Sequence, residues 1–223
     1  MDEFCICFSL AELYGSALSR LKTACRFDPA KEMHARMLDD ALAAHADFAR
    51  GAELAAAARF FEPSAPQGTS LTVSGVAFSC AAFAQLDERN LTGIIAYAVT
   101  LRRDAAPRRD TGRLFYEDVW GNAYIEAALD ALRTELAARA DGVLSDSFGP
   151  GYYGMAPAEM KKLARVLDFG KIGAEVLENG IIRPQKSCAG ILFTVRNAAL
   201  MPAALCRDCA GDRAVCALCG RSR

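Results

Sequence analysis

The sequence predicts an α+β fold in which helices flank a twisted, mixed or antiparallel sheet. Helical patterns come first along the chain, and strand-like runs follow without strict alternation with helices. The chain has 223 residues, of which 52% are hydrophobic, so it can bury a substantial core. These observations argue against a doubly wound parallel sheet.

The first half of the chain contains two helical signals. Ser9 begins a capping-box pattern ahead of apolar residues at helical spacing, which predicts the first helix. Asp28 followed by Pro29 predicts a second helical start. We expect the alanine-rich run that follows to be helical as far as about Arg59, with a break at Gly51.

Strand signals dominate the next part. Residues 60–78 are short β-type runs separated by proline and glycine, and an apolar strand is expected over 94–101. A long amphipathic helix is predicted over 116–140, and Pro157 opens another helix. The segment 174–195 contains three strand-like runs.

These patterns divide the chain into three segments. We expect an N-terminal helical region over 1–60, an α+β core over 61–200 and a cysteine-rich tail over 201–223.

Charge and hydropathy limit the classes of partner. Lys plus Arg number 26 against 27 for Asp plus Glu, so there is no overall positive field for nucleic acid or an anionic membrane. The sequence contains no long apolar stretch free of charges, so neither a membrane span nor a secretory signal is predicted. A cytoplasmic location is therefore expected. An arginine-rich segment is expected to be a solvated loop or, alternatively, a docking surface for an acidic partner; its members are Arg102, Arg103, Arg108, Arg109 and Arg113.

The tail carries two C-x2-C pairs, formed by Cys206, Cys209, Cys216 and Cys219. Each pair can bring two thiolates to one tetrahedral metal, and four thiolates favour zinc or an iron–sulfur cluster. The remaining cysteines are expected to be inert buried thiols: Cys5, Cys7, Cys25, Cys80 and Cys188. We expect His34 and His45 to be helix-surface or packing residues, too far apart to share a metal.

The stretch DSFGPGYYGMAP, residues 146–157, predicts a ligand-binding loop. Glycine lets the backbone approach a ligand closely, and proline reduces the entropy lost when the loop is ordered. Tyr152 and Tyr153 add flat faces suited to a purine or a cation. The alternative is a tight surface turn without a ligand.

The sequence downstream of this loop resembles the activation domain of cobalamin-dependent methionine synthase and the small free-standing proteins similar to it. The likeness covers roughly residues 30–200 and is densest after Val143. The matching positions are Pro150, Gly151 and Tyr152; Lys171, Ile172 and Gly173; Glu178; and Pro184, Lys186 and Ser187.

The resemblance implies binding of S-adenosylmethionine beside a corrinoid protein. In that family the sulfonium methyl group is passed to reduced cobalt, which draws an unfavourable reduction forward. The implied partners are therefore a corrinoid-binding methyltransferase protein that carries the cobalamin and a flavodoxin or ferredoxin-type electron donor. No acid/base pair or nucleophilic triad is required, so no catalytic side chain is predicted and the enzyme class is left open.

The resemblance also suggests site residues. The backbone of Pro150, Gly151 and Tyr152 would line the ligand, and Glu126 would meet its positive charge or, alternatively, be a solvated helix acid. Lys186 and Ser187 would support the site or form a structural turn.

One position departs from the family pattern. The family has an arginine, suited to a carboxylate, where this chain has Ser147, and Arg183 is a candidate substitute. This departure leaves a second function open. The chain would then be a non-enzymatic accessory or electron-transfer module for a corrinoid protein, working through its four-cysteine tail.

Overall fold

The computed structural model describes residues 3–28, 30–103 and 111–201. The helices are α1 (Leu10–Cys25), α2 (Glu32–Phe48), α3 (Thr111–Arg139) and α4 (Met160–Val166). The strands are β1 (Glu3–Phe8), β2 (Ala52–Phe61), β3 (Ser70–Val73), β4 (Val76–Ser79), β5 (Leu91–Arg103), β6 (Val143–Leu144), β7 (Glu175–Val176), β8 (Ile182–Arg183) and β9 (Ser187–Val195).

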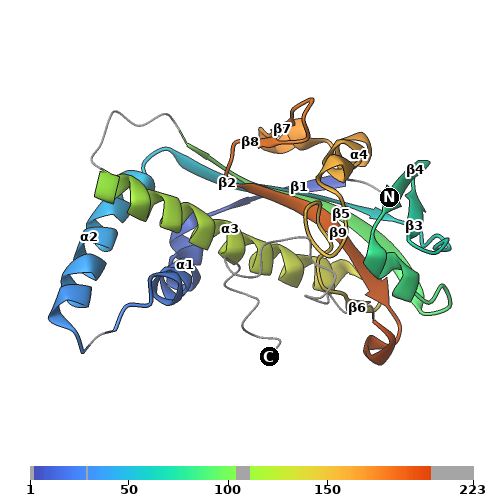
Figure 1. Ribbon diagram of the computed structural model, residues 1–223, viewed down its shortest axis with the longest axis horizontal. Helices are drawn as coiled ribbons and strands as arrows, with labels where there is room; N and C mark the ends of the chain where they lie inside the picture. Colours follow the sequence, from blue (N-terminus) through green and yellow to red (C-terminus); the bar gives the residue numbers. More distant parts are fainter. Residues whose placement is uncertain (1–2, 29, 104–110, 202–223) are drawn as a thin grey trace.

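The main sheet has five strands in the order β1-β2-β5-β9-β6, and every neighbouring pair is antiparallel (Figure 1). Two small hairpins, β3-β4 and β7-β8, complete the strand structure. The predicted α+β class is confirmed, and the sheet is antiparallel in the described chain. The predicted strand over 94–101, the long helix and the three strand-like runs after residue 174 are also confirmed.

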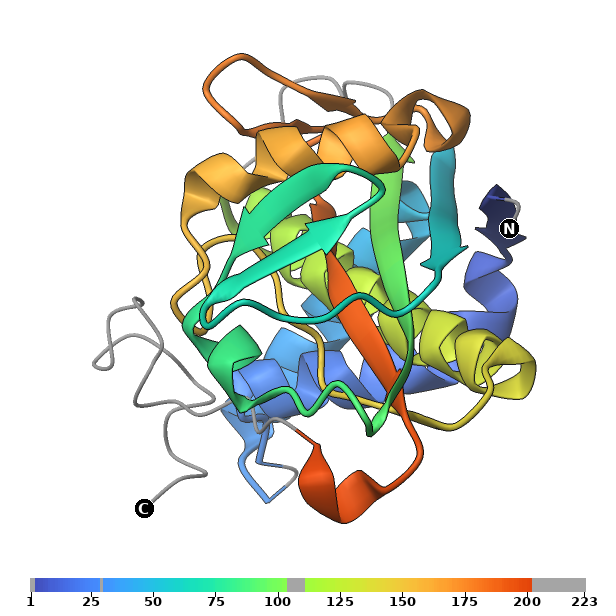
Figure 2. The same ribbon diagram turned by 90° about the vertical axis from the view of Figure 1, so that its right-hand side faces the viewer.

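The two faces of the main sheet carry different coverings. Helices α1, α2 and α3 pack on one face, where Tyr97, Leu101 and Leu192 point. The β3-β4 hairpin, α4 and several turns cover the other face (Figure 2). Each face has its own buried apolar cluster, so the sheet is buried on both sides.

The alanine-rich run 52–59 is a strand, and its predicted helical structure is wrong. β2 pairs along its whole length with β5 and along six residues with β1. Alanine favours a helix over other ordinary residues by at most about 0.7 kcal/mol per residue. That preference is smaller than the cost of leaving the buried backbone groups of β5 without partners, about 1–3 kcal/mol for each group.

Helix α2 begins at Glu32, about one turn after the predicted start. The carboxylate of Asp28 accepts a hydrogen bond from Ala30 N–H at 3.0 Å, and Asp28 N–H donates to His34 Nδ1 at 2.9 Å. Asp28 therefore closes a turn ahead of the helix, while residue 29 lies outside the described residues. Ser9 does precede α1, but its side chain makes no capping hydrogen bond.

Strand β1 and all but the last residue of β2 lie within the predicted N-terminal helical region, yet both strands belong to the same sheet as β5. Residues 3–8 and 52–61 thus contribute to a core shared with later parts of the chain. The behaviour of 1–60 and 61–200 as separate units stays a prediction.

An aromatic cluster fixes the helices on their face of the sheet. The imidazole of His45 on α2 lies 4.4 Å from the Trp120 ring of α3, between ring centroids, and its Nε2 is 2.8 Å from Tyr124 Oη. Trp120 Nε1–H donates to Ala41 O at 2.8 Å. Burial lowers the pKa of His45 and raises the pKa of Tyr124 to about 12. His45 is therefore a packing residue, as expected.

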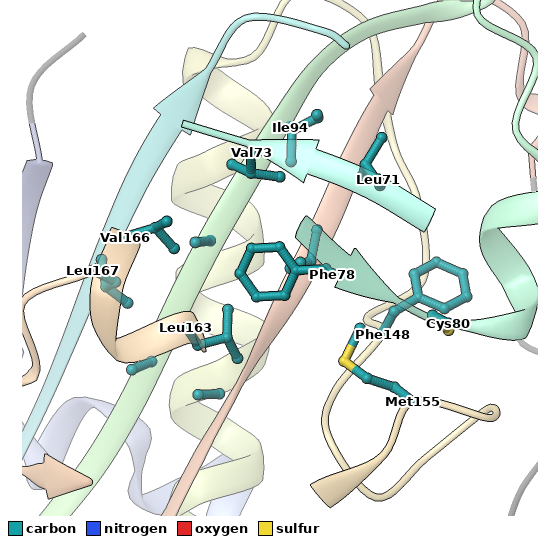
Figure 3. Close-up of a cluster of buried hydrophobic side chains, with 14 of the residues drawn as sticks. Leu71, Val73, Phe78, Cys80, Ile94, Phe148, Met155, Leu163, Val166 and Leu167 are labelled. Carbon is teal, nitrogen blue, oxygen red and sulfur yellow. The ribbon is translucent and has the colours of Figure 1, made fainter. Parts of the chain in front are cut away.

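The opposite face is closed by shorter elements. Phe78 from β4, Leu163 from α4 and Phe148 from the glycine-rich segment are all fully buried there (Figure 3). Met155 and Cys80 lie beside Phe148 at one end of this cluster. The segment that carries the candidate loop is thus part of the core.

Three of the five arginines in the predicted polar loop belong to regular structure. Arg102 and Arg103 end β5, and Arg113 is in the first turn of α3. Each is paired with an acidic side chain: Arg102 with Glu53, Arg103 with Glu117 and Arg113 with Asp47. The solvated-loop prediction is wrong for these three, and Arg108 and Arg109 lie outside the described residues.

Among the described residues, no helix combines the length and apolar character needed to cross a bilayer.

Candidate functional site

The glycine-rich segment starts as an extension of the sheet. After β6, Ser145 N–H donates to Phe193 O at 2.8 Å, and Phe148 exchanges two backbone hydrogen bonds with Ile191 at 2.9 and 2.8 Å. Val143 pairs with Val195, whereas Phe148 pairs with Ile191, so this strand has one residue more than β9 between the two pairs. The extra residue makes a bulge at 146–147, a feature that re-aims side chains.

Two glycines let the segment lie directly against β9. A Cβ at Gly190 would be 2.8 Å from Phe148 O, and a Cβ at Gly149 would be 2.9 Å from Ala189 O. Both neighbours are backbone atoms and cannot turn aside. The sequence therefore needs glycine on both strands at this crossing.

Beyond Gly149 the chain forms a compact turn. Gly151 N–H donates to Met155 O at 2.8 Å, and Met155 N–H donates to Tyr152 O at 2.9 Å. The Cys80 thiol donates to Tyr153 O at 3.3 Å. Because one end is fixed by β9 and the other by buried Met155, the shape of this turn, residues 149–154, is set without a ligand.

The two tyrosines of the turn differ in environment. Tyr152 is 58% exposed, and a Cβ at neighbouring Gly151 would meet nothing within 4 Å. Tyr153 packs its ring against Phe148, with 5.9 Å between centroids, and holds a φ of 53°. Tyr152 faces open space, whereas Tyr153 contributes to packing.

Ser147 makes a side-chain contact across β9. Its Oγ forms a hydrogen bond with Tyr97 Oη, and Tyr97 is paired in register with Gly190. Because Gly190 has no side chain, the Tyr97 phenol passes over β9 and reaches the bulge. Burial raises the pKa of Tyr97, while the hydrogen bond to Ser147 and the charge of Arg133 act in the opposite direction.

Arg133 was not among the predicted site residues, although it lies at the base of the segment. Its Nη2 donates to Ser145 O at 2.9 Å from helix α3. Sequence reasoning had no signal for it, because an arginine within a long helix is ordinarily a surface residue.

Glu126 occupies the same helix but does not contact the turn. Its Oε2 accepts a hydrogen bond from Arg20 Nη1 at 2.8 Å, and this pair is on the surface. Burial raises the pKa of Cys188 to about 12, with the charge of Glu126 adding to the effect. The ion pair with Arg20 places Glu126 on the exposed surface of α3, beside α1.

Lys186 and Ser187 have structural partners at the entry to β9. Lys186 Nζ is 2.7 Å from Asp118 Oδ1 and donates to Asn122 Oδ1 at 2.6 Å, so it ties β9 to α3. Ser187 Oγ donates to Pro184 O at 2.7 Å.

Arg183 and Glu178 lie on the β7-β8 hairpin and its turn, and both are exposed. A shallow hollow at Arg183 is lined by residues 173–175 and Pro184. No contact joins either side chain to the turn 149–154 within the described chain.

The predicted metal site in the tail, Cys206, Cys209, Cys216 and Cys219, lies outside the described residues. Within 3–28, 30–103 and 111–201, no group of three or more His, Cys, Asp or Glu side chains is arranged to hold a metal ion. The prediction of buried thiols is wrong for Cys5 and Cys7, which are exposed on the edge strand β1. Phe4, Ile6 and Phe8 of this strand pack toward the helices, so Cys5 and Cys7 point to the opposite face of the sheet, where they are open to solvent.

The geometry suits ligand holding more than bond-breaking chemistry. The turn offers fixed backbone groups and one exposed aromatic ring, the adjacent bulge offers the Ser147 hydroxyl, and α3 offers the Arg133 guanidinium. Such a set can orient a small polar molecule with an aromatic part.

No protein-family model matches the sequence, and no curated protein matches it. Among solved structures, the crystal structure of the MetH reactivation domain bound to AdoHcy has a similar fold, with a TM-score of 0.59. The two chains are 12% identical, and the match covers 89% of this chain and 80% of that chain. At this identity the likeness shows the fold alone, and it confirms the predicted activation-domain-like architecture.

Proposed function

We propose that this chain binds S-adenosylmethionine, or the S-adenosylhomocysteine (AdoHcy) that remains after methyl transfer, at the turn 149–154. One observation carries the proposal: the turn is fixed at both ends, while Gly151 and Tyr152 face open space. A site whose shape is set beforehand loses little conformational entropy when a ligand binds. The fold shared with an AdoHcy-bound domain supports this choice of ligand.

The residues of the turn take separate roles in this proposal. The backbone of Pro150, Gly151 and Tyr152 lines the ligand, and the exposed Tyr152 ring stacks on its purine. Tyr153 holds the turn in place through Phe148 and Cys80.

The proposed partner is a cytoplasmic methyltransferase protein that carries a corrinoid. An electron from a flavodoxin or ferredoxin-type donor would reduce the cobalt of that partner. The reduced cobalt would then take the methyl group from the sulfonium, leaving AdoHcy. The role of this chain is to hold the methyl donor with its methyl group exposed. Positioning of this kind needs no acid or base from the protein.

Calorimetric titration with S-adenosylmethionine and with AdoHcy tests the proposal. We expect saturable binding of one ligand per chain. Absence of binding at millimolar ligand would contradict it. Adenosine serves as the control, because it has the purine and lacks the amino-acid part.

A second candidate function rests on the four cysteines of the tail and on the uncharged Ser147. In this alternative the chain is an accessory or electron-transfer module for the corrinoid protein, with zinc or an iron–sulfur cluster at Cys206, Cys209, Cys216 and Cys219.

Metal analysis of anaerobically purified protein tests this alternative. Zinc without visible absorbance would identify a structural site, whereas iron with a broad brown band would identify a redox cluster. Replacing Cys206 and Cys219 by serine should release the metal. If the turn 149–154 also binds AdoHcy, that binding should remain intact, because the tail and the turn are then separate sites. Metal-free protein with four freely reacting tail thiols would contradict the site.

A further inference from the structure

Arg133 has an unusual environment for an arginine. It is half-buried between α3 and the start of the glycine-rich segment, and Nη2 donates to Ser145 O at 2.9 Å. Within the described chain no carboxylate lies within 4.0 Å of its guanidinium. A partly buried charge without a counterion is unfavourable, so this arginine is suited to receive an anion.

The other basic side chains that contact α3 from elsewhere in the fold are already paired. Arg20 bonds to Glu126 and Asp130, and Lys186 bonds to Asp118. Within the described residues, Arg133 is also the only basic side chain that hydrogen-bonds to residues 145–148. Among the described basic side chains that contact α3 or residues 145–148, Arg133 is therefore the one without a carboxylate partner, and it lies just before the turn.

A second donor lies beside this guanidinium. The bulge directs the Ser147 hydroxyl to Tyr97 Oη, and Tyr97 is buried with 3% of its surface exposed. When the Tyr97 phenol donates to Ser147 Oγ, the proton of Ser147 is free for another acceptor. Ser147 then offers an O–H, and Arg133 offers several N–H groups at Ser145, two residues earlier in the segment. The charge of Arg133 also acts on the Tyr97 phenol that contacts Ser147.

We propose that Arg133 and Ser147, with Tyr97 behind Ser147, form the subsite that binds the carboxylate of the ligand's amino-acid part. This inference rests on the proposed function, because it assigns one end of the same ligand. A guanidinium can hold both oxygens of a carboxylate through parallel N–H bonds. The family pattern has an arginine at position 147, and Arg183 was the candidate substitute for it. In this proposal the positive charge comes instead from Arg133 on helix α3.

The test compares AdoHcy with methylthioadenosine, which keeps the purine, ribose and thioether and lacks the carboxylate. Loss of a hydrogen-bonded charge pair weakens binding by about 10- to 150-fold. We therefore expect Arg133→Gln to weaken AdoHcy by this factor and to leave methylthioadenosine unchanged. Arg183→Gln is the matched control, and it should change neither affinity.

The outcomes separate this inference from the proposed function. Wild-type protein that binds both ligands equally well would overturn the subsite and leave the adenosyl site standing. Wild-type protein that binds neither would overturn both. Equal loss of both ligands in Arg133→Gln would show a structural role for Arg133 and overturn the subsite.

Two further variants keep the inference testable if Arg133→Gln is unstable. Arg133→Lys preserves the positive charge but not the paired N–H groups, so AdoHcy should weaken by an intermediate factor with methylthioadenosine unchanged. Tyr97→Phe removes the phenol behind Ser147 and should weaken AdoHcy less than Arg133→Gln does. An AdoHcy affinity that neither variant alters would overturn the subsite.

Discussion

The two faces of the main sheet are held in place by different means. Three helices of 16, 17 and 29 residues cover one face through buried aromatic contacts between distant elements. The other face is covered by a hairpin, the seven-residue α4 and turns. There, a second buried apolar cluster holds these elements, and backbone hydrogen bonds and close glycine contacts along β9 position the glycine-rich segment. The comparison indicates that the helical face is a scaffold, while the face of short elements carries the turn 149–154, as loops on rigid scaffolds often do. The proposed carboxylate subsite adds Arg133 and Tyr97, which belong to the helical face.

Trp120→Ala should destabilise the packing of the helices on the sheet and have the largest effect on stability. Trp120 is fully buried and donates to Ala41 O, so its truncation leaves a large cavity and removes this hydrogen bond. We expect the free energy of unfolding to fall by about 3–5 kcal/mol, measured by urea denaturation. The protein that remains folded should keep its AdoHcy affinity. A fall in affinity would show that the two faces are coupled.

Gly190→Ala should disturb the glycine-rich segment directly. The added methyl group would lie 2.8 Å from Phe148 O and 3.1 Å from Ser147 Oγ, so the segment must shift away from β9. We expect a loss of about 1–3 kcal/mol in unfolding free energy, together with weaker AdoHcy binding.

Gly15→Ala is the control for this substitution. A Cβ at Gly15, within α1, would meet nothing within 4 Å. This variant should gain about 0.5–1 kcal/mol and bind AdoHcy normally. If both glycine variants altered AdoHcy binding, the effect would not be specific to the crossing at β9.

Acid should weaken the scaffold face through His45. Its pKa is lowered in the folded state by burial, so protonation favours the unfolded chain. The stability that neutral His45 contributes is present above the unfolded-state pKa of about 6.5 and is lost as pH falls through the lower, folded-state pKa. The urea midpoint should be measured at one pH above this range and at one pH below it. The midpoint of the wild type should be lower at the acidic pH, and the midpoint of His45→Gln should fall less. Parallel curves for the two proteins would contradict the assignment.

Tyr152→Ala should affect stability least and still affect binding. Tyr152 is 58% exposed, so the unfolding free energy should change by less than about 0.5 kcal/mol. Loss of stacking on the purine should weaken AdoHcy by about 1–3 kcal/mol. Tyr152→Phe, which keeps the ring, should bind nearly as wild type. If Tyr152→Ala bound AdoHcy normally, the proposed stacking of the Tyr152 ring on the purine would be wrong.

The sequence predicted the elements whose signals are local. Apolar spacing located α1, α3 and β5, because each pattern lies within one element. It could not locate β2, since an alanine run has no strand pattern and its conformation depends on pairing with two other strands.

The conformation of the glycine-rich segment was predicted in the same partial way. Glycine, proline and tyrosine marked the turn 149–154 correctly, because backbone requirements can be read from residue type. The contacts of Ser147 with Tyr97 and of Ser145 with Arg133 join parts of the chain that only folding brings together. Gly190 inside a strand was the available signal for a close backbone approach.

The position of β9 has a consequence for how the chain folds during synthesis. β9 lies between β5 and β6, although both of these strands are made before it. Until residues 187–195 leave the ribosome, one edge of β5 has no partner and the glycine-rich segment has nothing to dock against. An unpaired edge of this kind can recruit other chains, and pairing across long sequence separations is slow. We therefore expect nascent chains of this protein to depend on chaperones late in translation, and the candidate site to be among the last parts to form.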